Sequence, residues 1–125
     1  MTLKKILVID DEIDIREIAR ISMEMSKGWE VITATNGKEG LLVASEQQPD
    51  AILLDLTMPE MDGLTTLRQL KKHHSTKYIP VILLTAQVQS TIDQDYLKSG
   101  AKAIFIKPFD PVILGDQVEL SLGWR

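Results

Sequence analysis

Five short apolar runs, separated by segments with helical patterns, constrain the fold of this chain more than any other feature. The runs cover residues 4–9, 29–33, 51–54, 79–84 and 103–106. Short runs rich in Val, Ile and Leu are typical of strands that are buried on both faces of a parallel sheet. The sequence therefore predicts five strands.

The segments between the runs have the apolar spacing of helices. From Glu12 to about Met25, apolar residues at Ile15, Ile18 and Met25, with Ser22 as a weaker member, predict one buried helical face. Further helices are predicted from a capping box at Asn36 and Glu39, from Leu64, Leu67 and Leu70, around Ile92, Tyr96 and Leu97 before Gly100, and from Asp110-Pro111 to Leu122, with Gly115 in its middle.

Alternating strands and helices imply right-handed crossovers and a doubly wound α/β fold, in which helices cover both faces of a five-stranded parallel sheet. The expected strand order is 2-1-3-4-5, which is the order of the flavodoxin-like folds. We expect residues 1–125 to form a single domain, with no output domain.

Composition narrows the classes of function. The formal net charge of −4 argues against direct binding to nucleic acid, because nucleic-acid binders usually carry a basic stripe. There is no cysteine for thiolate chemistry, and no apolar run approaches the ~20 residues of a membrane span. We therefore expect a cytoplasmic protein that does not contact a membrane.

Polar side chains follow four of the predicted strands. They are Asp10-Asp11-Glu12, Asp55, Thr85 and Lys107. Each one alone could simply begin a turn or cap a helix. Parallel strands, however, bring their carboxyl ends to one edge of the sheet, where neighbouring carboxylates would repel each other unless a cation lay among them. Because the donors are oxygens, the expected cation is Mg²⁺.

Four motifs connect this pattern with a known family. They are Ile9-Asp10-Asp11-Glu12, Leu54-Asp55 through Asp62-Gly63, Leu84-Thr85-Ala86, and Gly100-Ala101 followed by Lys107-Pro108-Phe109. In this order and spacing the chain resembles the receiver domains of two-component signalling, over essentially all of its 125 residues.

The resemblance implies a role for each residue at the strand ends. Asp55 would be the phosphoacceptor, a carboxylate nucleophile that forms an acyl phosphate. Asp11 and Asp55 would bind Mg²⁺ directly, Asp10 largely through a water molecule, and Thr57 through its main-chain carbonyl. Lys107 and Thr85 would meet the charge of the phosphoryl group.

Other positions are implied by the resemblance alone. The main-chain amides of Leu56 and Ala86 would assist, and the bond before Pro108 would be cis. Thr57 and Gln87 would border the path of the hydrolytic water.

One position departs from the family. The residue three before Lys107 is Ile104, where the family carries an aromatic side chain that rotates inward after phosphorylation. This departure questions the aromatic part of the coupling, and Phe105 should lie on the opposite face of its strand.

The resemblance implies a single-domain response regulator. It would accept a phosphoryl group from a histidine kinase or a phosphotransfer protein, and would catalyse only its own phosphorylation and dephosphorylation. Its target would dock on the face built from the fourth helix, the fifth strand and the fifth helix.

Four alternative functions compete with this interpretation. A Mg²⁺-dependent phosphatase would need a second acid where the chain has Thr57, and a flavin carrier would not place three acids in its first loop. A P-loop nucleotidase lacks its Gly-x-x-x-x-Gly-Lys motif. A receiver that no longer takes phosphate stays open, although all the key side chains are present.

His73 and His74 are adjacent and do not have the spacing of a chelating pair.

Overall fold

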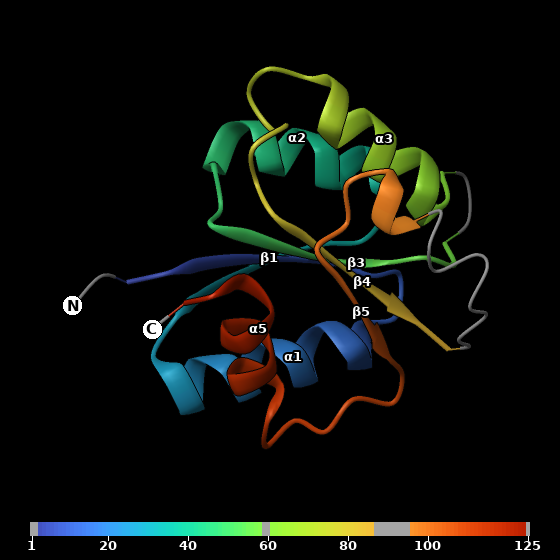
Figure 1. Ribbon diagram of the computed structural model, residues 1–125. Helices are drawn as coiled ribbons and strands as arrows, with labels where there is room; N and C mark the ends of the chain where they lie inside the picture. Colours follow the sequence, from blue (N-terminus) through green and yellow to red (C-terminus); the bar gives the residue numbers. More distant parts are fainter. Residues whose placement is uncertain (1–2, 59–60, 87–95, 125) are drawn as a thin grey trace.

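The computed structural model describes residues 3–58, 61–86 and 96–124, and its strands form one parallel sheet (Figure 1). The strands are β1 (Lys5–Ile9), β2 (Glu30–Ala34), β3 (Ala51–Asp55), β4 (Val81–Thr85) and β5 (Ala103–Ile106). Their order, β2-β1-β3-β4-β5, confirms the predicted order. The order reverses between β1 and β3, which is where ligands bind in open parallel sheets.

Helices cover both faces of this sheet. α1 (Ile13–Lys27) and α5 (Leu114–Leu122) lie on one face, and α2 (Gly37–Gln47) and α3 (Gly63–Lys72) lie on the other (Figure 1). Residues 96–98 are also helical, but most of the helix that was predicted around Ile92 falls outside the described residues.

The core divides into two layers because successive strand residues point to opposite faces. In β1, Leu7 and Ile9 belong to the layer beneath α2 and α3, while Ile6 and Val8 belong to the layer beneath α1 and α5. All four side chains are fully buried. Burial of one such side chain contributes roughly 1.5–3 kcal/mol, so these strand residues are the main source of stability.

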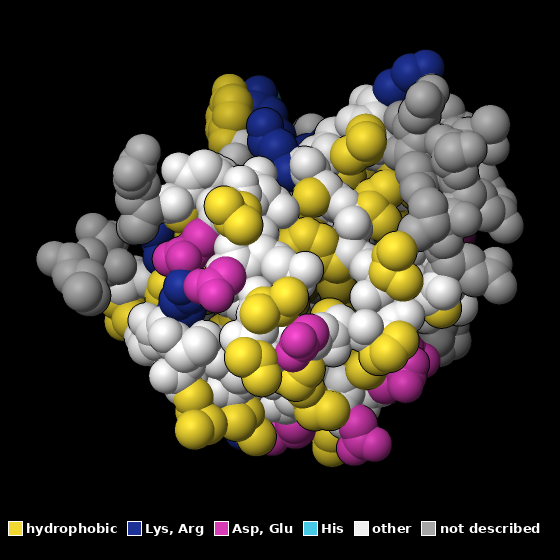
Figure 2. Space-filling model, turned by 60° about the horizontal axis from the view of Figure 1, so that its bottom comes forward, with side chains coloured by type: hydrophobic (Ala, Val, Ile, Leu, Met, Phe, Trp, Pro, Cys, Tyr) yellow, Lys and Arg dark blue, Asp and Glu magenta, His cyan; other side chains and the backbone are white. Residues whose placement is uncertain are grey.

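The predicted buried face of α1 is correct only in part. Ile15 packs against the core, but Ala19 and Met23 are the fully buried residues of this helix, whereas Ile18 is 45% exposed and Met25 is 82% exposed. Ile18 and Met25 therefore lie on the outer side of the helix. Figure 2 shows the resulting apolar side chains on the α1 and α5 face, with acidic side chains among them.

The last helix begins later than predicted. α5 starts at Leu114, and the Asp110 side chain accepts a hydrogen bond from the Val112 amide (2.9 Å) instead of capping a helix at Pro111. Gly115 is therefore the second residue of α5 and is not in its middle. A side chain at Gly115 would meet the Lys27 side chain of α1, at 2.8 Å, so this glycine permits close packing of the two helices.

The predicted cap of α2 at Asn36 is confirmed, and Glu39 reaches back one residue further than in a standard capping box. The Glu39 amide donates to Asn36 Oδ1 (2.8 Å), and the Glu39 carboxylate in turn accepts from the Thr35 amide (2.6 Å).

β5 departs from the expectation that every strand is buried on both faces. It is an edge strand, and Ile106 at its end is 52% exposed.

Candidate functional site

The carboxyl ends of the strands bring the predicted site residues together at one edge of the sheet. Asp10 follows β1, Asp55 is the last residue of β3, Thr85 is the last residue of β4, and Lys107 follows β5. Asp10 is fully buried and Asp55 is 3% exposed. Two carboxylates without access to bulk water need a positive partner close by.

Lys107 is that partner. Its Nζ lies 2.8 Å from Asp10 Oδ2, 3.2 Å from Asp55 Oδ1 and 3.8 Å from Glu12 Oε1. Burial disfavours the charged amine, but the hydrogen bonds and charges of Asp10 and Asp55 outweigh burial and raise the pKa of Lys107. The lysine is therefore a fixed cation beside both acids.

Main-chain groups hold the two carboxylates in place. The Glu12 amide donates to Asp10 Oδ1 (2.9 Å), and the Thr57 amide donates to Asp55 Oδ1 (3.2 Å). Arg16 closes the turn after β1 because its Nη1 donates to the Asp10 carbonyl (2.7 Å). Neither the Arg16 contact nor the Thr57 amide was predicted from the sequence, although Arg16 lies one helical turn after Glu12.

Burial, followed by the nearby charge of Asp10, raises the pKa of Asp55 from 3.8 to about 6, although the Thr57 amide and Lys107 oppose the shift. The ionised form is therefore held at an energetic cost. An acid whose pKa is raised on folding stabilises the fold fully below its unfolded pKa, and this contribution is lost as the pH rises through the folded value.

Asp55→Asn should consequently stabilise the fold at pH 7 in buffer without divalent cations. The gain over the original chain should grow between about pH 4 and pH 7 and reach about 3 kcal/mol, since the pKa rises from 3.8 to about 6 and one pKa unit corresponds to ~1.4 kcal/mol. Urea unfolding at a series of pH values measures it. A difference that stays constant with pH would contradict the assigned charge cost.

The acids at this edge fit a small divalent cation. Asp10, Asp11 and Asp55 each offer a carboxylate oxygen, and these oxygens all lie within 4.8 Å of one another. Oxygens on opposite sides of one Mg²⁺ are separated by about 4 Å, so small side-chain shifts suffice. Asp10 Oδ2 is buried and, apart from its ion pair with Lys107, has no hydrogen-bond partner among the described residues. Asp11 is exposed and gives the site its opening to solvent.

The remaining predicted residues are placed as follows. The bond between Lys107 and Pro108 is cis, as the resemblance implied. The Leu56 amide was expected to assist at the site. It donates instead to the Leu84 carbonyl (3.0 Å) and is thus engaged in the sheet. Ile104 packs against the core layer beneath α2 and α3, and Phe105 packs on the opposite layer, which confirms their alternation. Pro59 and Gln87 lie outside the described residues, and no contact is described for the amide of Ala86.

A glycine supports the loop after Asp55. Gly63 is the first residue of α3, its amide donates to the Leu56 carbonyl (3.0 Å), and a Cβ there would lie 2.5 Å from the Asp55 carbonyl oxygen. Asp62, the N-cap of α3, accepts from the Thr65 amide (2.8 Å), and this hydrogen bond lowers its pKa. The turn therefore places α3 directly behind the site.

Gly63→Ala should lower the free energy of unfolding by about 1–3 kcal/mol, because the contacted atoms are main chain and cannot rotate away. It should also shift the amide resonances of Leu56 and Thr57. Gly123→Ala serves as a comparison, since a Cβ at Gly123 meets no atom within 4 Å and only its positive φ of 69° is strained. Equal losses in both variants would contradict the close packing behind Asp55.

A family model for the response regulator receiver domain matches residues 6–119. The chain is 40% identical to a probable transcriptional regulator, ycf27, of Pyropia yezoensis, over 96% of this chain and 52% of that protein. It is 41% identical to the DNA-binding dual master transcriptional regulator RpaA of Synechocystis sp., over 85% of this chain and 44% of that protein. The chain thus spans about half the length of these relatives.

Solved structures agree with this match. The chemotaxis response regulator CheY4 of Vibrio cholerae superposes with a TM-score of 0.89 at 30% identity, covering 96% of this chain and 99% of that one. A putative response regulator from Chloroflexus aurantiacus gives a TM-score of 0.87 at 30% identity, covering 98% and 99%. In the part of the chain that the structure describes, no helix is both long and apolar enough to cross a membrane.

Proposed function

This chain belongs to the family of response regulator receiver domains, and we propose that it accepts a phosphoryl group on Asp55 with the help of Mg²⁺. One observation carries the proposal. Asp55 is a buried carboxylate whose Oδ1 lies 3.2 Å from Lys107 Nζ, in a cluster with Asp10 and Asp11 that is open to solvent on one side. A nucleophile, a fixed cation and a set of oxygen ligands are thus present in one place.

The chemistry follows from these neighbours. A carboxylate oxygen of Asp55 attacks the phosphorus of a phosphohistidine, the P–N bond breaks, and the bonding pair returns to the donor imidazole. An acyl phosphate forms, which water later cleaves to restore the carboxylate and release phosphate. Asp55 must be ionised to attack, and its pKa of about 6 leaves it mostly ionised at neutral pH.

Lys107 and Thr85 meet the charge of the transferred group. The ammonium of Lys107 would move from the carboxylates to a phosphoryl oxygen, and the hydroxyl of Thr85 would donate to another. Asp10, Asp11, Asp55 and the Thr57 carbonyl would hold a Mg²⁺ ion, which would neutralise charge between the nucleophile and the phosphoryl group. The protein catalyses only its own phosphorylation and dephosphorylation in this proposal.

The proposed partners are a histidine kinase or phosphotransfer protein as donor and a docking protein as target, in the cytoplasm. Residues 1–125 would act as one receiver unit, and the acidic cluster at the phosphorylated edge supports output through a protein partner at that edge.

The proposed docking surface includes the described part of the predicted face. Between β5 and α5 lies a cleft of about 300 Å³, lined among others by Ile104, Ile106 and Gln117. β5 is the edge strand, and the loop from Lys107 to Asp110 connects this cleft directly with the site. A movement of Lys107 toward phosphate could therefore change the shape of the cleft.

Amide resonances of the protein with Mg²⁺, and then with Mg²⁺ and beryllofluoride, test the proposal. We expect Mg²⁺ at millimolar concentration to shift the amides of Asp11 and Thr57, since the site is open and rich in water. Beryllofluoride, which mimics the phosphoryl group, should extend the shifts to Ile104 and Tyr96, although less than an aromatic residue at 104 would allow. The absence of any Mg²⁺ shift would refute the metal site, and shifts confined to the loops around Asp55 would refute this docking face.

A further inference from the structure

A basic surface lies at the edge of the sheet opposite to Asp55. α3 runs antiparallel to the strands, so its carboxyl end and the loop into β4 lie at the amino ends of the strands, as does the loop that precedes β5. We define the basic face as Lys71, Lys72, Lys77, Tyr78 and Lys102. No acidic residue occurs in the sequence between Asp62 and Asp93.

Lys71 ties the segments of the basic face together. Its Nζ donates to the Ile79 carbonyl (2.7 Å) and to the Lys77 carbonyl (3.3 Å), and its carbon chain passes 3.0 Å from the position of a Cβ at Gly100. Burial and the nearby charge of Lys102 lower the pKa of Lys71. The positive charges of Lys71 and Lys102 therefore act on one another.

The lysines of the basic face take part in no ion pair among the described residues. Among the described residues, Lys71, Lys72, Lys77 and Lys102 form no ion pair with a carboxylate, whereas Lys27 contacts Asp116 and Glu119. Asp50, at the same edge, accepts a hydrogen bond from the Lys5 amide instead. Lys71 and Lys72 also stabilise the carboxyl end of α3 through the helix dipole, but this reason does not extend to Lys77 or Lys102.

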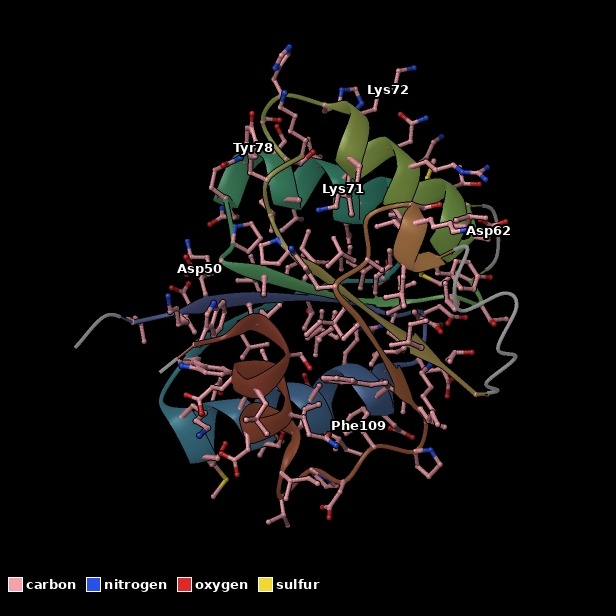
Figure 3. The ribbon with its side chains drawn as sticks, viewed as in Figure 1. Asp50, Asp62, Lys71, Lys72, Tyr78 and Phe109 are labelled. Carbon is pink, nitrogen blue, oxygen red and sulfur yellow. The ribbon has the colours of Figure 1, made fainter. Side chains whose placement is uncertain are left out.

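An aromatic ring stands among these cations. Tyr78 is 82% exposed, and Lys77 Nζ lies 5.0 Å from the centre of its ring. Figure 3 shows Lys72 and Tyr78 directed outward on the α3 side of the molecule, while Lys71 points inward beneath them. An exposed tyrosine is costly to hydrate fully and offers a flat surface on which a base can stack.

We propose that the basic face binds single-stranded nucleic acid, with Lys72, Lys77 and Lys102 contacting phosphates and Tyr78 stacking on a base. Both parts match the usual composition of such sites, which combine a positively charged surface with an aromatic side chain. An acidic peptide would use the lysines but not the open ring. An anionic membrane would favour several exposed apolar side chains beside the cations, and on this face Tyr78 is the prominent one.

The test is fluorescence anisotropy of a labelled single-stranded oligonucleotide of mixed sequence, titrated with the whole chain. Three phosphate contacts predict a slope of about −2 for log K against log salt concentration, and a Kd on the order of 10⁻⁴ M at physiological salt. The variant carrying Lys72→Gln, Lys77→Gln and Lys102→Gln should lose this slope and most of the binding. Tyr78→Ala should weaken binding about tenfold with the slope unchanged, because base stacking is not ionic.

Lys38→Gln is the matched control, since Lys38 is an exposed lysine at the start of α2, on the phosphorylation edge. It should bind like the original chain. An equal loss of binding in this control would overturn the proposal. So would a competition experiment in which polyglutamate, at the same concentration of negative charge, displaces the labelled oligonucleotide as well as unlabelled oligonucleotide does. Asp55→Asn should bind normally, so a failure of the proposed phosphorylation would not affect this result.

Discussion

Asp55→Asn should abolish labelling of the protein by acetyl phosphate while leaving the fold intact. Only a carboxylate can form the acyl phosphate, and an amide of the same shape keeps the packing at the end of β3. Asp55 lies beside Lys107 and within the acidic cluster at the topological switch point. We therefore expect no detectable incorporation under conditions in which the original chain is labelled.

Asp14→Asn is the matched control for this result. Asp14 is an exposed aspartate in the first turn of α1, and its replacement removes the same charge from the same end of the molecule. It should be labelled normally. Incorporation into Asp55→Asn at the level of the control would move the acceptor to another residue.

Lys107→Met should have the largest effect on stability. The replacement leaves Asp10 and Asp55 buried without their common cation, and breaking a buried ion pair from one side costs about 3 kcal/mol or more at neutral pH. Because Lys107 lowers the pKa of Asp55, its loss should raise that pKa further, and the destabilisation should shrink as the pH falls. Labelling should slow by about 100-fold, as for the loss of one group that stabilises transition-state charge.

Adding Mg²⁺ distinguishes this account from a general packing defect. A divalent cation among the acids should restore part of the stability that Lys107→Met loses, by preferential binding to the folded state. Lys38→Met, at an exposed position, should change stability by less than about 0.5 kcal/mol. A loss in Lys107→Met that is independent of both pH and Mg²⁺ would contradict the electrostatic role of Lys107.

The topology of the sheet was predictable because burial acts on strands and helices in different ways. β3 and β4 are buried on both faces, and their unbroken apolar runs identify them as central strands. In α1 the apolar residues surround the helix, so periodicity did not decide which side faces the sheet. Ala19, a small residue outside the predicted face, is fully buried in the core instead.

The members of the site were predictable from their positions at strand ends, but their contacts were not. Nothing in the spacing shows that Lys107 reaches Asp10 and Asp55 from across the sheet, because this distance depends on how the loop after β5 folds. The contacts of Arg16 and Gly63 were not predicted for a related reason. They act through main-chain carbonyls of the neighbouring turns, and such contacts leave no pattern in side-chain type.

The central claim is Mg²⁺-dependent phosphorylation of Asp55, and mapping the modified residue in the original chain tests it most directly. The protein is incubated with acetyl phosphate, with Mg²⁺ or with a chelator, reduced with borohydride to trap the acyl phosphate, digested, and sequenced by mass spectrometry. Reduction of the aspartyl phosphate should convert Asp55 to homoserine in the Mg²⁺ sample and leave it unchanged with the chelator. Homoserine at another aspartate, or equal conversion in both samples, would contradict the account.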